Sequence, residues 1–125
     1  MKATALLAAL ALSLATTGAI AEDKHEAKAL HGGLVMEANH LDYELVAKAD
    51  TIALYVRDHG KPVDLKGASG KLTLLAGSAK TEAALAPAGD KLEAKGAFPA
   101  AAGTKVVATV QLAGKKAANL RFTLK

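Results

Sequence analysis

Apolar and polar residues alternate along much of the chain, which is the pattern of a β-strand with one buried face. The apolar members of each run lie at every second position, so they share one side of a strand. The alternation covers residues 34–38, 41–48, 51–57, 72–74, 92–98, 106–112 and 120–124. The pattern therefore predicts a series of short strands from residue 34 onwards.

Glycine and proline separate these runs. Glycine permits backbone angles that other residues resist, and proline fixes φ and lacks an amide donor, so both favour turns. The predicted turns lie at residues 58–62 (DHGKP), 67–70 (GASG), 87–90 (PAGD) and 114–116 (GKK). Turns every ~8–12 residues are typical of all-β domains. We therefore expect an all-β fold, an Ig-like β-sandwich of about seven short antiparallel strands, or a small barrel.

Alanine-rich stretches leave one alternative open. Residues 79–86 (AKTEAALA) and 91–95 (KLEAK) contain good helix formers, so a variant with one helix is compatible with the sequence. Both stretches are short and bounded by glycine or proline, and their larger apolar residues still alternate, which favours strands. Small alanines on the inner faces indicate closely packed sheets rather than a roomy ligand cavity.

The first residues have the organisation of a secretory signal peptide. Lys2 precedes an uncharged stretch, residues 3–21, which ends in Ala19-Ile20-Ala21 and is followed by Glu22-Asp23. A positive start, an apolar stretch and an A-x-A ending predict that residues 1–21 are removed on export to the periplasm, which leaves no stable membrane anchor. An uncleaved anchor is the alternative, because a spanning helix needs about 20 mostly apolar residues, but residues 16–18 (TTG) dilute the stretch.

The remaining chain fits one domain. Residues 22–31 (EDKHEAKALH) are polar and lack a core-forming pattern, so we expect a flexible arm there. Gly32-Gly33 marks the start of a single β-sandwich domain, residues 32–125. The chain has no cysteine, so no disulfide braces the exported domain and its stability has to come from burial.

Composition excludes several function classes. The net charge is +4, or +3 without Lys2 in the signal segment, and the basic residues are dispersed along the sequence, which argues against nucleic-acid binding. The aromatic residues that could stack on bases are few: Tyr43, Tyr55, Phe98 and Phe122. Their scarcity also argues against a small-ligand carrier, because such pockets are usually lined by aromatic side chains.

No catalytic motif is complete. Ser69 and Ser78 lie outside any G-x-S-x-G sequence. Residues 67–71 (GASGK) resemble half of a phosphate-binding loop but lack the upstream glycine, and a glycine-rich turn explains them better. Residues 25–31 (HEAKALH) do not match the zinc-protease motif, because position 29 is alanine.

The carboxylates also argue against an enzyme. Most of them alternate outward along the predicted strands or fall in turns, which is typical of solvated surface charge: Glu37, Asp42, Glu44, Asp50, Asp58 and Asp64. Because no nucleophile–base pair is recognisable, we expect a protein that is not an enzyme.

Histidine is the residue type that suggests a site. The four histidines (His25, His31, His40 and His59) lie in the arm, a strand end or a turn. Imidazole is a common ligand of Cu(II), Zn(II) and Ni(II), Met36 would add a thioether suited to Cu(I), and Asp58 would bind metal or orient the neighbouring ring. A metal site of His31, His59, His25, Met36 and Asp58 requires Gly60 to let its turn fold towards the arm.

A plainer interpretation also fits these residues. Surface histidines in turns are ordinary, Met36 has the parity of a core residue, and no pair of histidines has metal-motif spacing.

Several segments together resemble a known kind of domain. They are His31-Gly32-Gly33 and residues 43–46 (YELV), 54–56 (LYV), 58–63 (DHGKPV), 67–70 (GASG), 85–89 (LAPAG), 92–98 (LEAKGAF) and 121–122 (RF). In this order they are similar to a small periplasmic β-sandwich segment found near, or fused to, periplasmic adaptor subunits of heavy-metal efflux (RND) pumps. The resemblance covers residues 31–125.

The resemblance implies an accessory role in transition-metal handling, with copper (or zinc) as the bound metal and an efflux adaptor as a partner. His31 and His59 lie inside the matching segments, whereas His25 and His40 lie outside them. The chain lacks an adaptor hairpin and a lipoyl-like module, so it is not itself a pump subunit.

Two hypotheses follow. The first is an exported monomer that binds copper and buffers it or delivers it to an efflux system, releasing it as the pH falls because histidine ligands must be deprotonated. The alternative is a metal-free interaction module that recognises an envelope protein through a sheet edge or face, using exposed strand residues such as Tyr55 and Arg57.

Overall fold

The computed structural model describes residues 28–125, and all of the regular elements in that part are β-strands. They are β1 (Leu34–Ala38), β2 (Leu41–Ala47), β3 (Thr51–Asp58), β4 (Lys61–Pro62), β5 (Ser69–Ala76), β6 (Ala79–Ala88), β7 (Lys91–Lys95), β8 (Lys105–Gln111) and β9 (Ala118–Thr123). Residues 79–86, for which a helix was the alternative, lie in β6. No helix in residues 28–125 has the length and apolar character needed to cross a membrane.

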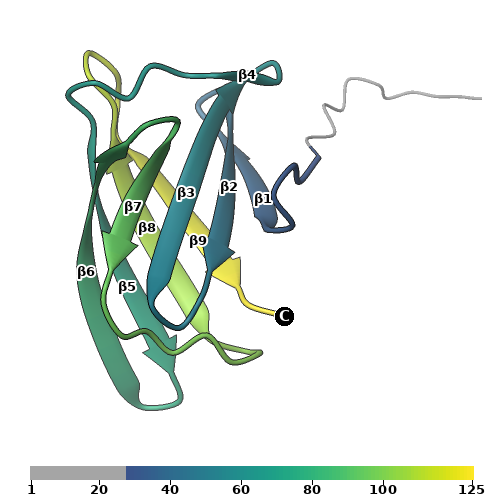
Figure 1. The fold of residues 1–125 in the computed structure, drawn as a ribbon, viewed down its shortest axis with the longest axis vertical. Helices are drawn as coiled ribbons and strands as arrows, with labels where there is room; N and C mark the ends of the chain where they lie inside the picture. The colour runs from purple at the N-terminus through teal and green to yellow at the C-terminus, as the bar shows by residue number, and fades with distance from the viewer. Residues whose placement is uncertain (1–27) are drawn as a thin grey trace, which may run out of the picture.

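The strands follow one continuous antiparallel path. Their order is β1-β2-β3-β7-β6-β5-β8-β9, and β4 pairs with the end of β3. Figure 1 shows the strands arranged around a common interior, with β9 (yellow) passing behind β2 and β3. The two ends of the path, β1 and β9, lie close together without a ladder between them, so the sheet is nearly closed into a barrel. The all-β prediction is confirmed. The predicted signal peptide and residues 22–27 of the predicted arm lie outside the described residues.

β6 connects the two halves of the barrel. Residues 79–85 pair with β5, whereas residues 86–88 pair with β7. The turn from β6 to β7 consists of Gly89-Asp90, because Ala88 is opposite Lys91. The turn predicted at residues 87–90 is therefore shorter than expected, and Pro87 lies within the strand.

The core consists of the alternating apolar residues. Along β5, β8 and β9 every second side chain is buried, and the residues between them face outward. These inward-facing residues are Leu72, Leu74, Val106, Ala108, Val110, Ala118, Leu120 and Phe122. Burial of each large apolar side chain stabilises the fold by roughly 1.5–3 kcal/mol. The period-two pattern correctly predicted the core face of these strands.

β2 differs because both of its faces are buried. Leu41, Tyr43 and Leu45 point into the core, as predicted, but Asp42 and Glu44 on the opposite face are only 5% and 0% exposed. On β3, Arg57 is likewise only 6% exposed. The predictions of solvated carboxylates at positions 42 and 44, and of an exposed arginine at 57, were wrong. The segment before β1 contacts Glu44 and Arg57 on this outer face.

Candidate functional site

Glu44 holds the chain that precedes β1. Its carboxylate accepts hydrogen bonds from the backbone amides of Leu30 (3.0 Å), His31 (2.8 Å) and Gly33 (2.8 Å). It also accepts one from Nη1 of Arg57 at 2.9 Å. Four donors therefore surround a carboxylate that has no contact with solvent, which is how a protein stabilises a buried charge.

Arg57 completes this arrangement. Its Nη1 pairs with Glu44, and its Nη2 donates to the carbonyl of Lys28 at 2.8 Å. The guanidinium is well suited to this position because its planar fork can serve two acceptors at once. The Glu44–Arg57 clamp, as we call this pair, fixes residues 28–33 (the arm segment) against the outer face of β2 and β3.

The clamp also sets the protonation of Glu44. Burial by itself raises the pKa of this carboxyl, but hydrogen bonds from Gly33, His31, Arg57 and Leu30 outweigh burial. The pKa of Glu44 therefore lies below the ordinary glutamate value of 4.5. The carboxylate is charged at neutral pH, as the arm segment requires.

Gly33 allows the arm segment to approach β2 closely. A Cβ atom at this position would lie 2.2 Å from the carbonyl oxygen of Leu45 and 2.9 Å from Cγ2 of Val46. The first contact is with backbone, which cannot move aside without disturbing the β-ladder. Glycine is therefore required here by space, and the close approach brings its amide within reach of Glu44.

The arm segment places His31 on an aromatic ring of the sheet. Tyr55 lies on the outward-facing side of β3, and the His31 imidazole stacks on it with a centroid distance of 3.7 Å and an interplanar angle of 14°. Nζ of Lys91, on β7, lies 5.7 Å from the centroid of the Tyr55 ring. Because the clamp fixes the backbone of residue 31, the stacked ring is held in place.

A cavity opens between the arm segment, the β3–β4 turn and the β6–β7 turn. Its volume is about 260 Å³. It is lined by Leu30, His31, Tyr55, Val56, Arg57, Gly60, Pro62 and Asp90. We call it the arm cleft. It combines apolar and aromatic side chains with one guanidinium and one carboxylate.

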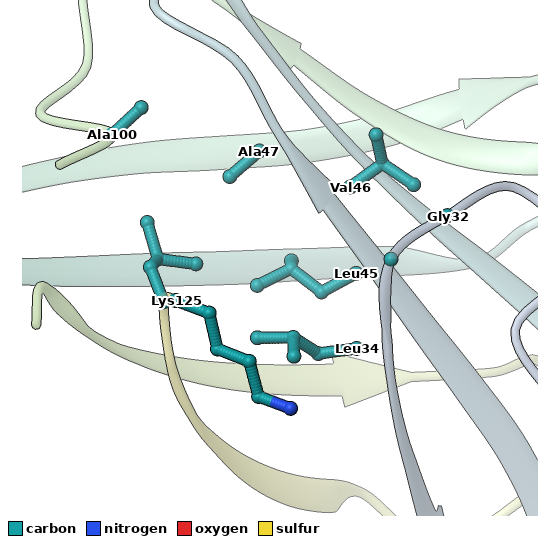
Figure 2. Close-up of a pocket in the computed structure, with 9 residues that line it drawn as sticks. Gly32, Leu34, Leu45, Val46, Ala47, Ala100 and Lys125 are labelled. Atoms are coloured by element: carbon teal, nitrogen blue, oxygen red, sulfur yellow. The ribbon is translucent and has the colours of Figure 1, made fainter. Parts of the chain in front are cut away.

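Two other hollows differ in chemistry. One, of about 460 Å³, lies on the outer face of β2, β3 and β7, and Tyr55 and Lys91 are among the residues that line it. The other, of about 360 Å³, lies near the unclosed joint between β1 and β9. Figure 2 shows the second hollow, where Leu34, Leu45 and the stem of Lys125 present mainly carbon atoms. It is lined by no histidine and no acidic side chain, so it offers no acid–base pair.

The predicted metal ligands are distributed over several places. His31 lines the arm cleft, whereas Met36 packs against the core. His59 lies in the β3–β4 turn, where its Nδ1 is hydrogen-bonded to Oδ1 of Asp58 at 2.6 Å. Gly60 of the same turn lines the arm cleft with His31. His25 lies outside the described residues.

Among the described members of this set, His31, Asp58 and His59 do not meet in one cluster. Within residues 28–125, no group of three or more His, Cys, Asp or Glu side chains is placed to hold a metal ion. The pairing of Asp58 with His59 is present, and the turn that carries them adjoins the cleft that contains His31.

Sequence reasoning missed the residues that build the cleft. Glu44 and Arg57 were interpreted as surface residues because they alternate with core positions, and alternation cannot reveal that a separate segment covers the outer face. The one sequence feature at this place is the pair Gly32-Gly33, which permits a close approach of the backbone but does not identify Glu44 or Arg57.

No model of a known protein family matches the chain, and no match is found among curated proteins or solved structures.

Proposed function

We propose that the protein is a binding module of the cell envelope that recognises a partner protein through the arm cleft and carries out no reaction. The observation that supports this proposal most directly is the clamp. A buried ion pair and three backbone hydrogen bonds fix residues that contribute little to the core, and these residues form one wall of a cavity. Such fixation pre-organises a recognition surface, which lowers the ordering cost of binding.

The chemistry of the cleft indicates what it would hold. Drug-sized ligands occupy pockets of about 300–1,000 Å³, so a cavity of about 260 Å³ suits a side chain better than a cofactor. Leu30, Tyr55 and Pro62 would contact an apolar side chain, and the exposed Asp90 would contact a polar group beside it. The proposed ligand is therefore an apolar anchor residue on an extended segment of the partner.

Site-specific photo-crosslinking in the intact envelope tests this proposal. A photoreactive amino acid at Leu30, which is 62% exposed, should give a discrete protein adduct, and Tyr55→Ala should reduce its yield. The same amino acid at exposed Ala102 is the control, because the β7–β8 loop that contains this position lies at the opposite end of β3 from the cleft. The resemblance described above makes an efflux adaptor the expected partner. Equal labelling from both positions would exclude the cleft as the binding site.

A second candidate function is transition-metal binding, with copper as the first choice and zinc as the alternative. It is favoured by the Asp58–His59 hydrogen bond, because a carboxylate commonly orients a ligating imidazole in this way. His31 lies in the cleft that the same turn borders. Since no three-residue site exists within residues 28–125, such a metal would complete its coordination from outside this part of the chain, which suits transfer to a partner.

Titration with Cu(II), Cu(I) and Zn(II) separates the two candidates. Metal handling predicts that His31→Ala and His59→Ala each weaken binding at least tenfold, whereas His40→Ala, in the β1–β2 turn, changes it little. Wild-type affinity no tighter than that of a histidine-containing peptide would leave the metal-free module as the function.

The proposed periplasmic location rests on residues 1–21. The mass of the protein isolated from the envelope tests it: a chain that starts at Glu22 is expected, and one that retains the first residues contradicts export with cleavage.

A further inference from the structure

Positive charge is concentrated in one half of the barrel. Residues 69–86 and 101–125, which contain β5, β8, β9 and most of β6, carry seven lysine or arginine side chains and one carboxylate, Glu82, a net side-chain charge of +6. The other described residues, 28–68 and 87–100, carry seven positive and eight negative side chains, a net charge of −1. The basic residues are dispersed in sequence, but the topology brings them together.

The strand register places four of these cations on one outward-facing surface. Residues directly opposite each other on antiparallel strands lie on the same face of the sheet. The buried residues of β5, β8 and β9 define the inward face, so the residues that alternate with them face outward. Lys71 is opposite Thr109, Arg121 is opposite Val107, and Leu75 is opposite both Lys80 and Lys105. We define the basic face as the exposed cations Lys71, Lys80, Lys105 and Arg121 with the outward residues between them. Glu82, its one carboxylate, lies 3.6 Å from Nζ of Lys80.

An apolar side chain lies between two of the lysines. Leu75 is 38% exposed and is one of two exposed large hydrophobic residues in the described part of the chain, the other being Leu30 in the arm segment. Its cross-strand neighbours on the basic face are Lys80 and Lys105. An apolar residue flanked by long cationic side chains is the arrangement that favours a membrane interface, where the cations contact headgroups and the apolar group reaches the acyl boundary.

The basic face takes no part in the cavities described above. None of the three cavities described above is lined by residues of β5, β6 or β8. We propose that the basic face binds the surface of an anionic phospholipid bilayer. The charge of the face complements such a surface, and Leu75 adds shallow apolar contact.

The basic face and the arm cleft point in different directions. The cleft lies on the outer side of β3, and the strand order separates β3 from β8 by β7, β6 and β5, so the two strands lie across the barrel from each other (Figure 1). Binding to a bilayer through the basic face would therefore leave the arm cleft open to the aqueous side. The proposal is independent of what the cleft binds.

Vesicle co-sedimentation of the protein isolated from the envelope tests the proposal. Binding is expected to vesicles that contain phosphatidylglycerol, to be weak to vesicles of phosphatidylcholine alone, and to decrease with salt because exposed charges are screened. The triple variant Lys71→Glu/Lys105→Glu/Arg121→Glu should reduce binding at least tenfold. Leu75→Ser should weaken binding while retaining its salt dependence.

A matched control variant separates the effect of the basic face on vesicle binding from the effect of net charge. Lys48→Glu/Lys66→Glu/Lys95→Glu changes the charge by the same amount at exposed positions outside the basic face, and it should retain most of the binding. Every variant keeps the N-terminal residues, so their contribution is common to all measurements. Urea unfolding establishes that each variant is folded, and the triple glutamine variant at positions 71, 105 and 121 replaces the glutamate variant if that one is not.

Two results would overturn the proposal. One is equal loss of vesicle binding in both triple variants. The other is binding to a soluble polyanion such as polyglutamate without binding to phosphatidylglycerol vesicles, which would assign the face to an acidic protein.

Discussion

At the scale of single residues, the unusual feature is a charged carboxylate with no exposure to solvent. Desolvation of such a group is costly unless hydrogen bonds replace its hydration. Glu44 receives one guanidinium and three backbone donors, so both carboxylate oxygens have partners. The same bonds determine where the arm segment lies, which links the energetics of one side chain to the shape of the cleft.

Glu44→Gln should destabilise the protein by about 3 kcal/mol, because it leaves the buried guanidinium of Arg57 without its counter-charge. Urea unfolding at neutral pH measures this effect. Glu37→Gln, at an exposed position on β1, is the matched control and should change stability by less than about 0.5 kcal/mol. Similar values for the two variants would mean that the clamp contributes nothing to stability.

The contribution of Glu44 should also depend on pH with a defined sign. Its pKa is lower in the folded protein than the ordinary value of 4.5, so the folded state binds its proton less readily. This stabilisation is complete above about pH 4.5 and is lost as the pH falls through the folded-state pKa. Unfolding free energies of wild type and Glu44→Gln, measured from neutral pH to about pH 3, should therefore converge in acid. A constant difference would contradict the depressed pKa.

Gly33→Ala should be destabilising by roughly 1–3 kcal/mol, because its Cβ would overlap the carbonyl oxygen of Leu45. Amide hydrogen exchange at residues 30, 31 and 33 should become faster as the arm segment moves away from Glu44. At Gly96 an added Cβ would lie 3.4 Å from its nearest neighbour, the Phe98 ring, so Gly96→Ala should change little.

At the scale of elements, alternation was sufficient to predict most strands and their inner faces. It predicted the buried side of β5, β8 and β9 because the opposite side of those strands faces solvent. It failed for β2, where the arm segment covers the other side as well. Period two describes which residues share a face, but it cannot say whether a non-adjacent segment packs on that face.

Two of the turns have histidine in a left-handed conformation. In the β1–β2 turn Asn39 and His40 have φ values of 52° and 66°, and in the β3–β4 turn His59 and Gly60 have values of 53° and 85°. Positive φ at both central residues is the type I′ geometry, which matches the twist of a hairpin and favours Asn-Gly. Each histidine therefore occupies a position where a Cβ atom is unfavourable.

His40→Gly should raise the stability by up to about 1 kcal/mol, because it relieves this strain and creates the preferred Asn-Gly turn. Thermal unfolding measures the change. His40→Ala keeps the Cβ atom and should not stabilise, so an equal gain in both variants would point to loss of the imidazole as the cause.

At the scale of the whole molecule, the barrel has one unclosed joint between β1 and β9. The backbone groups of these two strands that face the joint have no ladder partner within residues 28–125. Hydrogen exchange should therefore be faster at alternate amides of β1 and β9 than at those of β3 and β5, which have strands on both sides. Uniform protection across all four strands would indicate that the barrel closes in solution.

The candidate surfaces also emerge only at this scale. His31 and Tyr55 are 24 positions apart in sequence, and the cations of the basic face come from four strands. The residue types suggested that the histidines are ligands of a site. Which side chains meet depends on the strand order, however, and the strand order cannot be inferred from periodicity. For this reason the sequence predicted the fold class, whereas the groups that meet at the arm cleft and on the basic face become apparent only from the strand order.

The division of β6 between two pairing partners has a consequence for splitting the chain. Residues 79–85 pair with β5 and residues 86–88 pair with β7. A fragment that ends at residue 78 lacks β6, and so does a fragment that begins at residue 89. Each of these fragments therefore contains a strand whose partner is missing. Each piece alone should remain unfolded, whereas cleavage in the loop at residues 99–103 would leave β6 intact between its neighbours. That loop is therefore the place where two co-expressed fragments should reassemble.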